Sequence, residues 1–132
     1  MRDGLTRRIQ PMRRPDLKSF LDRFRASLVV VAGDNAGKAY ALNQKELVLG
    51  RGAEATIRIE DEALSRRHAL FEVYGDGFRV TDLSSTNGVF VNGERVAEAN
   101  LKHGDRVDLG SQKCKYVVEE IKKKPQVYVV SE

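Results

Sequence analysis

The sequence is poor in the residues on which cross-links, metal sites and covalent catalysis depend. Its 132 residues include one cysteine, Cys114, and two histidines. One cysteine excludes an internal disulfide, and a chain without disulfides favours a reducing, cytoplasmic environment. The sequence also has no cluster of metal ligands and no glycine-rich nucleotide loop. We therefore predict that the protein is not an enzyme and binds neither a metal nor a cofactor.

Long hydrophobic runs are also missing. The longest covers only residues 28–32, whereas a membrane-spanning helix needs about 20 apolar residues. The beginning of the chain is charged and lacks the apolar segment of a signal peptide. With 41% hydrophobic and 32% charged residues, the chain has the composition of one globular domain. We expect a single folded body and no membrane span.

Positive charge is concentrated in the first 27 residues. This segment has a net charge of +5 and residues 28–132 have −1, which together give the formal +4 of the chain. The isoelectric point of about 9.3 therefore originates in the N-terminal segment. It is no argument that the folded body binds nucleic acid.

Residues 1–27 are predicted to form a basic arm followed by an amphipathic helix. Residues 1–15 hold five arginines and two prolines, and Asp16 is placed to cap a helix. Apolar residues then recur at helical spacing, at Leu17, Phe20, Leu21, Phe24 and Leu28. We favour a helix that docks on the domain or on a partner. The alternative is an arm that contacts a membrane surface or nucleic acid.

From Leu28 onward the pattern changes to short strands separated by turn residues. Apolar and polar residues alternate, for example in 71–74 and 78–81. Asn92-Gly93 is a strong signal for a tight hairpin, because both residues accept a positive φ. Closely spaced strands without helices predict an all-β sandwich over residues 28–121. Cys114 lies in one alternating run and is expected to be a buried structural thiol.

Residues 122–132 begin with three lysines and a proline, which are typical of a solvated linker. Residues 127–130 have high strand propensity. They are expected to add an edge strand, to pair with a neighbouring molecule, or to remain unpaired, and the sequence leaves these alternatives open.

Three polar clusters interrupt the strands. They are Gly50-Arg51, Ser65-Arg66-Arg67-His68 and Ser85-Thr86-Asn87-Gly88. Each is rich in hydrogen-bond donors and has no acid at its centre. Loops between strands can emerge at one end of a sandwich, so we expect one pooled site. A phosphorylated side chain, with nearly two negative charges and three acceptor oxygens, suits such donors.

The order and spacing of the clusters resemble the signature of forkhead-associated (FHA) domains. The signature reads GR at Gly50, S-x-x-H at Ser65, D-x-x-S-x-N-G ending at Gly88, and V-N-G ending at Gly93. The SRRHA form is most similar to bacterial members, and the resemblance covers residues 28–121. It implies a sandwich of about eleven short strands. It also implies a non-catalytic module that binds phosphothreonine-containing proteins, kinases or their substrates, in Ser/Thr kinase signalling.

The resemblance further implies a role for each donor. Arg51 is expected to contact the phosphate, Ser65 to donate its hydroxyl and its backbone N–H, and Arg66 to add a second contact. Thr86 is expected to lie beside the phosphate, and Asn87 to bind the peptide backbone next to the phosphothreonine. For Arg51 taken alone, a structural ion pair is an equal alternative.

Other motif residues are expected to shape the loops. Gly50 and Gly88 are interpreted as serving backbone conformation, and His68 as supporting its loop without acting as a base. Asp82 is expected to brace the third cluster by hydrogen bonds. Arg67 is interpreted as a surface charge, with a second phosphate contact as the alternative.

Two segments are candidates for reading the residue three places after the phosphothreonine, which the resemblance implies is a specificity position. They are residues 33–38 and 60–64. The acids at 60–62 favour a basic or apolar residue there. Within the chain itself, Thr6 has an isoleucine three places later and lies in the basic arm. We hypothesise that phosphorylated Thr6 occupies the site of its own chain or of a neighbour, which gives self-association.

Two other functions compete with this interpretation. The first is binding of nucleic acid or an acidic surface through residues 1–27, but the arm lacks base-stacking aromatics and any DNA-binding motif. Nucleic acid is therefore not favoured as a partner. The second is a structural adaptor that has lost its ligand. The presence of Arg51, Ser65, Thr86 and Asn87 argues against it.

Overall fold

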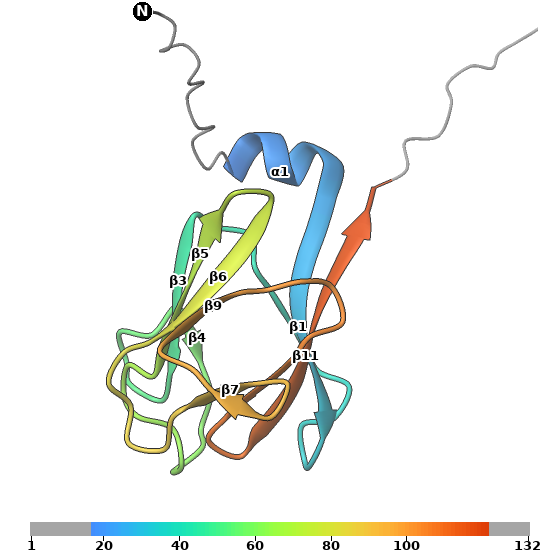
Figure 1. Cartoon of the computed structure of the whole chain (residues 1–132). Coiled ribbons are helices and arrows are strands. Elements are labelled where there is room, and N and C mark those ends of the chain that lie inside the picture. Colours follow the sequence, from blue (N-terminus) through green and yellow to red (C-terminus); the bar gives the residue numbers. More distant parts are fainter. Residues whose placement is uncertain (1–16, 122–132) are drawn as a thin grey trace, which may run out of the picture.

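The part of the chain that the structure describes consists of two β-sheets packed face to face, with one short helix at one end (Figure 1). A computed structural model describes residues 17–121. Within this range the elements are α1 (Leu17–Arg23), β1 (Phe24–Ala32), β2 (Ala39–Ala41), β3 (Glu46–Gly50), β4 (Ile57–Arg58), β5 (Ala69–Tyr74), β6 (Gly77–Asp82), β7 (Val89–Val91), β8 (Glu94–Arg95), β9 (Glu98–Asn100), β10 (Arg106–Leu109) and β11 (Gln112–Glu120). The predicted all-β sandwich is confirmed.

The two sheets have different strand orders. The first runs β2-β1-β11-β10-β7-β8, and the second runs β4-β3-β5-β6-β9. Alternate residues of the longer strands point between the sheets, as the pleat of a strand requires. In β5, for example, Ala69, Phe71 and Val73 are buried whereas Glu72 is partly exposed. Burial of these apolar side chains is the main source of stability.

Cys114 lies in the core, as predicted. Its side chain is buried within β11 and forms no disulfide. Burial raises the pKa of the thiol to about 12, with a smaller contribution in the same direction from Asp108. The group is therefore a neutral, structural thiol at physiological pH.

The predicted helix is wrong from Phe24 onward. α1 ends at Arg23, and Phe24 begins β1, which pairs with β11 from Phe24 opposite Glu120. The hydrogen bonds of this long ladder outweigh the helical spacing of the apolar residues. The predicted boundary at residues 27–28 consequently falls inside β1. Asp16, the expected cap, lies outside the described residues.

The short helix contributes to the core instead of standing apart from it. Phe20 is buried, and its ring packs edge-on against Phe78 of β6 with centroids 5.8 Å apart. α1 thus covers one end of the sandwich, seen at the top of Figure 1. No helix within residues 17–121 has the length and apolar character needed to cross a membrane.

The hairpin predicted at Asn92-Gly93 is confirmed. Asn92 has φ 52° and Gly93 has φ 88°, and the two residues connect the antiparallel strands β7 and β8. Positive φ at both positions matches the twist of the flanking strands. The turn returns the chain toward the beginning of β7, so that Arg95 lies opposite Phe90. The predicted strand at 127–130 lies outside the described residues.

Candidate functional site

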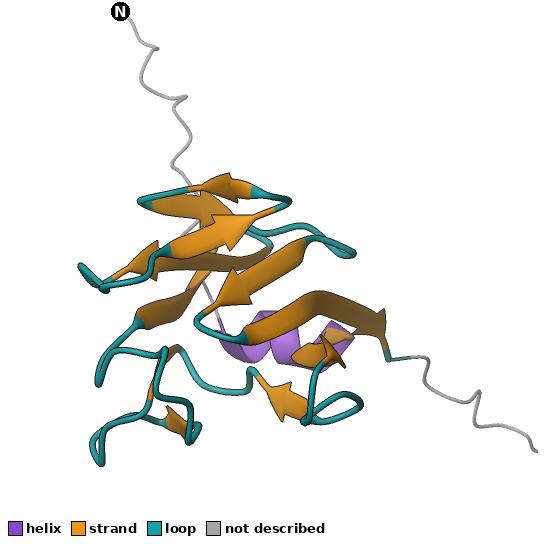
Figure 2. Cartoon of the chain, turned by 90° about the horizontal axis from the view of Figure 1, so that it is seen from below, coloured by secondary structure: helices purple, strands orange, loops and turns teal. Residues whose placement is uncertain are grey.

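The three polar clusters meet at the end of the sandwich opposite α1. The loops after β3, before β5 and after β6 gather there, at the bottom of Figure 1, and Figure 2 views the molecule from that side. They surround a depression of about 370 Å³. Its lining residues are Arg51, Glu62, Ala63, Leu64, Ser65, Arg66, Thr86 and Asn87. All five predicted ligand-binding residues are therefore brought together, although Arg66 and Thr86 are distant in sequence.

The first loop places Arg51 against the second. The Nε of Arg51 donates a hydrogen bond to the Leu64 carbonyl at 2.8 Å. One of the five guanidinium N–H groups is thereby used, and the fork is held in place by it. Among residues 17–121 Arg51 forms no salt bridge, so the alternative of a structural ion pair is not realised there. Its exposed charge remains available to an anion.

Gly50 serves close approach of two backbones. A β-carbon built on Gly50 would lie 2.1 Å from the Arg66 carbonyl oxygen. Gly50 does not have a positive φ, so it serves the backbone through this close approach and not through a left-handed conformation. Without a side chain at this position, the Arg51 N–H reaches the Ser65 carbonyl at 3.1 Å. The first loop is thus tied to the second along its backbone.

Ser65 connects the second loop to the third. Its Oγ accepts a hydrogen bond from the Thr86 backbone N–H at 3.0 Å. A hydroxyl that accepts at its oxygen still has its own proton to donate. The backbone N–H of Ser65 is used inside the loop, since it donates to Nδ1 of His68 at 3.0 Å. The expectation that this N–H is offered to a ligand is therefore wrong for the geometry seen here.

Asn87 is held at the same part of the second loop. Its Nδ2 donates to the Ala63 carbonyl at 2.8 Å, while the residue stays exposed. The amide oxygen forms no hydrogen bond within the described part of the chain. Asn87 is therefore positioned by one bond and keeps both a donor and an acceptor for a peptide backbone.

His68 lies beneath the site and is fully buried. Because Nδ1 accepts the Ser65 N–H, the proton is on Nε2, which donates to the Gly88 carbonyl at 2.8 Å. The neutral ring thus bridges the second and third loops. This arrangement leaves neither nitrogen free for proton transfer, which agrees with a structural role.

The third loop is stabilised internally. The Asp82 carboxylate accepts from the Ser85 N–H at 2.9 Å, as the bracing role predicts, and Ser85 Oγ accepts from the Gly88 N–H at 2.9 Å. Gly88 has φ 86°, a conformation that favours glycine. A β-carbon there would lie 2.7 Å from Nε of Arg95. Ser85 belongs to the predicted third cluster, but its role in holding Gly88 was not predicted, and neither was the position of Arg95.

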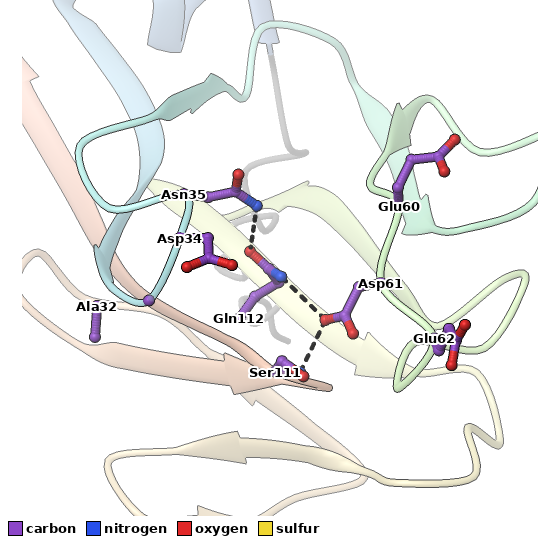
Figure 3. A pocket seen from close by; sticks show the side chains of 9 residues that line it. Ala32, Asp34, Asn35, Glu60, Asp61, Glu62, Ser111 and Gln112 are labelled. Atoms are coloured by element: carbon purple, nitrogen blue, oxygen red, sulfur yellow. Dashed lines mark hydrogen bonds between the residues drawn. The ribbon is translucent and has the colours of Figure 1, made fainter.

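A second hollow adjoins the depression. It has a volume of about 550 Å³ and is lined by both segments that we expected to read specificity (Figure 3). Its lining residues are Ala32, Gly33, Asp34, Asn35, Glu60, Asp61, Glu62, Ser111 and Gln112. Glu62 lines both hollows, so they are neighbours at the second loop.

Asp61 is the centre of a network that connects three loops (Figure 3). Its carboxylate accepts from the backbone N–H groups of Ala63 and Ser111, each at 2.9 Å, and from Nε2 of Gln112 at 3.0 Å. Gln112 in turn accepts from Asn35 at 3.3 Å. Burial acts to raise the pKa of Asp61, but the hydrogen bonds outweigh it and hold the pKa below its usual value. Sequence reasoning missed this network because its members are far apart in the chain.

Comparison with known proteins identifies the architecture. The sequence model of the FHA domain matches residues 47–110. The chain is 44% identical over 85 residues to the glycogen accumulation regulator GarA of Mycolicibacterium smegmatis, which covers 64% of this chain and 54% of that protein. The chain thus spans about half the length of this relative.

Solved structures with a similar fold are also FHA domains. One comes from a study of phosphothreonine-dependent FHA domain interactions, with a TM-score of 0.64, 33% identity and coverage of 70% of this chain and 95% of that one. Another is the FhaA FHA domain in complex with the intracellular domain of Rv3910, with a TM-score of 0.61, 34% identity and coverage of 71% and 99%. The chain belongs to the FHA domain family.

Proposed function

We propose that this protein is a non-catalytic module that binds phosphothreonine-containing peptides and proteins in Ser/Thr kinase signalling. One observation carries the proposal: the Arg51 guanidinium, unneutralised within the described residues, shares a depression with the Ser65 hydroxyl. Both groups are fixed in place before a ligand arrives. Fixed donors bind an anion at a lower entropic cost than mobile ones.

The chemistry of the depression suits a phosphate ester. Arg51 and Arg66 supply positive charge, Ser65 supplies a hydroxyl proton, and the Thr86 side chain adds a further hydroxyl. Asn87 has an amide oxygen and an amide hydrogen free for the peptide backbone next to the phosphoresidue. A doubly charged ester gains charge-assisted hydrogen bonds here that an unmodified threonine cannot form.

The relatives support the same function and the same kind of partner. One similar FHA domain is described by its phosphothreonine-dependent interactions, and another by a complex with an intracellular domain. GarA is named a regulator of glycogen accumulation. We infer that the partner here is a kinase or a kinase substrate phosphorylated on threonine, and that the two meet in the cytoplasm.

Thr6 is our candidate for a ligand from the chain itself. It lies outside the described residues, and α1 lies at the end of the sandwich away from the site (Figure 1). The eleven residues from Thr6 to Leu17 reach at most about 36–40 Å when extended. Arg7 and Arg8 follow Thr6 directly, and their charge is opposite to that of Glu62 beside the depression.

An oriented peptide library tests the proposed function. Peptides with phosphothreonine fixed at the centre and three random residues on each side are passed over the immobilised protein. We expect retention by the wild type and a loss on the order of ten- to hundred-fold with Arg51→Ala, which corresponds to about 1.5–3 kcal/mol for hydrogen bonds to a charged group. Arg25→Ala, an exposed arginine of β1, is the matched control and should behave as wild type. Equal retention after phosphatase treatment of the library would refute the proposal.

A further inference from the structure

Arg95 lies beside the site but outside the phosphate depression. It is the last residue of β8, opposite Phe90 of β7. Side chains of such a pair lie on the same face of the sheet, and Gly88 comes directly before β7. A β-carbon on Gly88 would lie 2.7 Å from Nε of Arg95 and 2.9 Å from its Cζ. The guanidinium therefore extends toward the loop that carries Thr86 and Asn87.

The loop beneath this guanidinium is held in place by hydrogen bonds. The Gly88 carbonyl accepts from buried His68 at 2.8 Å, and the Gly88 N–H donates to the buried Ser85 hydroxyl at 2.9 Å. Asn87, one residue earlier, is held to Ala63 at 2.8 Å. The Arg95 side chain therefore lies against a residue whose own backbone is held to the rest of the site.

The charge of Arg95 is not neutralised by the rest of the described chain. Within residues 17–121 the salt bridges are formed by Arg58, Arg79 and Arg106, and Arg95 forms neither a salt bridge nor a side-chain hydrogen bond. The residue is exposed. Its neighbour Glu94 points to the opposite face of β8, as alternation along a strand requires.

The two sides of the third loop consequently differ in charge. Asn87 faces the second loop, where Glu62 lines the depression, whereas Gly88 has Arg95 against it. Two backbone steps of 3.8 Å separate the α-carbons of Thr86 and Gly88 by at most about 7–8 Å. An extended peptide advances ~3.3 Å per residue, so Arg95 is within reach of a side chain two or three places from a phosphothreonine.

We propose that Arg95 determines specificity by pairing with an acidic side chain two or three residues from the phosphothreonine of the partner. This inference rests on the proposed function. A pair at an exposed rim is weak, and the expected selection for Asp or Glu over Ala is on the order of two- to five-fold. It falls as salt is added, because exposed charges are screened.

The phosphothreonine library described above tests this proposal when the retained peptides are sequenced by position. Wild type is expected to enrich Asp and Glu at the second or third position on one side of the phosphothreonine. Arg95→Met keeps a long side chain over Gly88 without the charge, and it should abolish this enrichment while retention still depends on phosphate. Arg95→Glu should enrich Lys and Arg at the same position. Arg25→Met removes an exposed charge from the end of the sandwich near α1 and should keep the wild-type enrichment.

Each contrary result points to a different failure. Phosphate-dependent retention by wild type without any acidic enrichment, or with the same enrichment in Arg95→Met, would overturn the role of Arg95 and leave the proposed function intact. A wild-type protein that retains phosphorylated and dephosphorylated peptides equally would overturn the proposed function itself. We expect Arg95→Met to unfold at the same temperature as the wild type. Unchanged stability would show that a change in peptide selection comes from the lost charge and not from lost packing on Gly88.

Discussion

The hydroxyl oxygen of Ser65 accepts the backbone N–H of Thr86 at 3.0 Å, although the two residues are 21 positions apart in sequence. This bond connects the second and third loops and leaves the Ser65 proton for a ligand. The neighbouring residues repeat the arrangement, because the carbonyls of Ala63 and Leu64 accept from Asn87 and Arg51. Three consecutive residues of the second loop thus position groups from the first and the third loops.

Ser65→Ala should therefore reduce the affinity for a ligand far more than it reduces the stability of the fold. We expect phosphothreonine peptides to bind on the order of ten-fold or more weakly, because a hydrogen bond to a charged group contributes about 1.5–3 kcal/mol. Thr86 is exposed, so water can replace the lost acceptor and the free energy of unfolding should fall by less than about 1 kcal/mol. Fluorescence polarisation and urea denaturation measure the two quantities. A large loss of stability with unchanged affinity would contradict this division.

Asp61→Asn should destabilise the loops in a pH-dependent way. The carboxylate accepts three hydrogen bonds and its pKa lies below the usual 3.8, so its stabilisation is present above pH 3.8 and is lost as pH falls through the folded-state pKa. At pH 7 we expect the free energy of unfolding of the variant to be about 1–3 kcal/mol lower than that of the wild type. This difference should become smaller below pH 3.8.

Asp34→Asn is the matched control for that measurement. Asp34 lines the same hollow but forms no hydrogen bond or salt bridge among residues 17–121. Its substitution should change the free energy of unfolding by less than about 0.5 kcal/mol. Equal effects of the two variants across the pH range would show that the network around Asp61 is not the cause.

Phosphorylated Thr6 should bind the site. A synthetic peptide of residues 1–12 with phosphothreonine at position 6 is expected to bind at least about ten-fold more tightly than its unphosphorylated twin, since only the phosphate forms charge-assisted bonds. Arg51→Ala should remove the difference, and Arg25→Ala should not. Affinities that are independent of phosphorylation would eliminate Thr6 as a ligand. Sedimentation of the phosphorylated full chain at several concentrations distinguishes binding within a chain from binding between chains.

Cys114 should be unreactive in the folded protein. The side chain is buried, and its pKa of about 12 keeps it as a thiol at neutral pH. A thiol reagent at pH 8 should therefore modify it only through unfolding, and completely in guanidinium chloride. Because the folded-state pKa is raised above 9.0, this group favours folding below pH 9 and loses that contribution as pH rises toward 12. Stoichiometric modification of the native protein within seconds would contradict its burial.

Much of the fold could be read from residue patterns. Alternation predicted the sandwich, and Asn92-Gly93 predicted the β7–β8 hairpin, because both signals depend on local backbone geometry. The helix was predicted too long, since the spacing of Phe24 and Leu28 fits a helix as well as it fits one face of a strand. Pairing of β1 with β11, almost 90 residues away, settled this stretch in favour of the strand.

By itself the sequence determined which residues could carry a binding site. Their types and their order along the chain are enough to resemble the FHA signature, and each loop needs only its own turn residues to form. The tertiary structure alone decided how they are connected: that Arg51 rests on Leu64, that Gly50 makes room for Arg66, and that Arg95 lies against Gly88. Such contacts join segments that are independent in sequence. They exist only after the packing of two sheets has brought the loops to the same end of the sandwich.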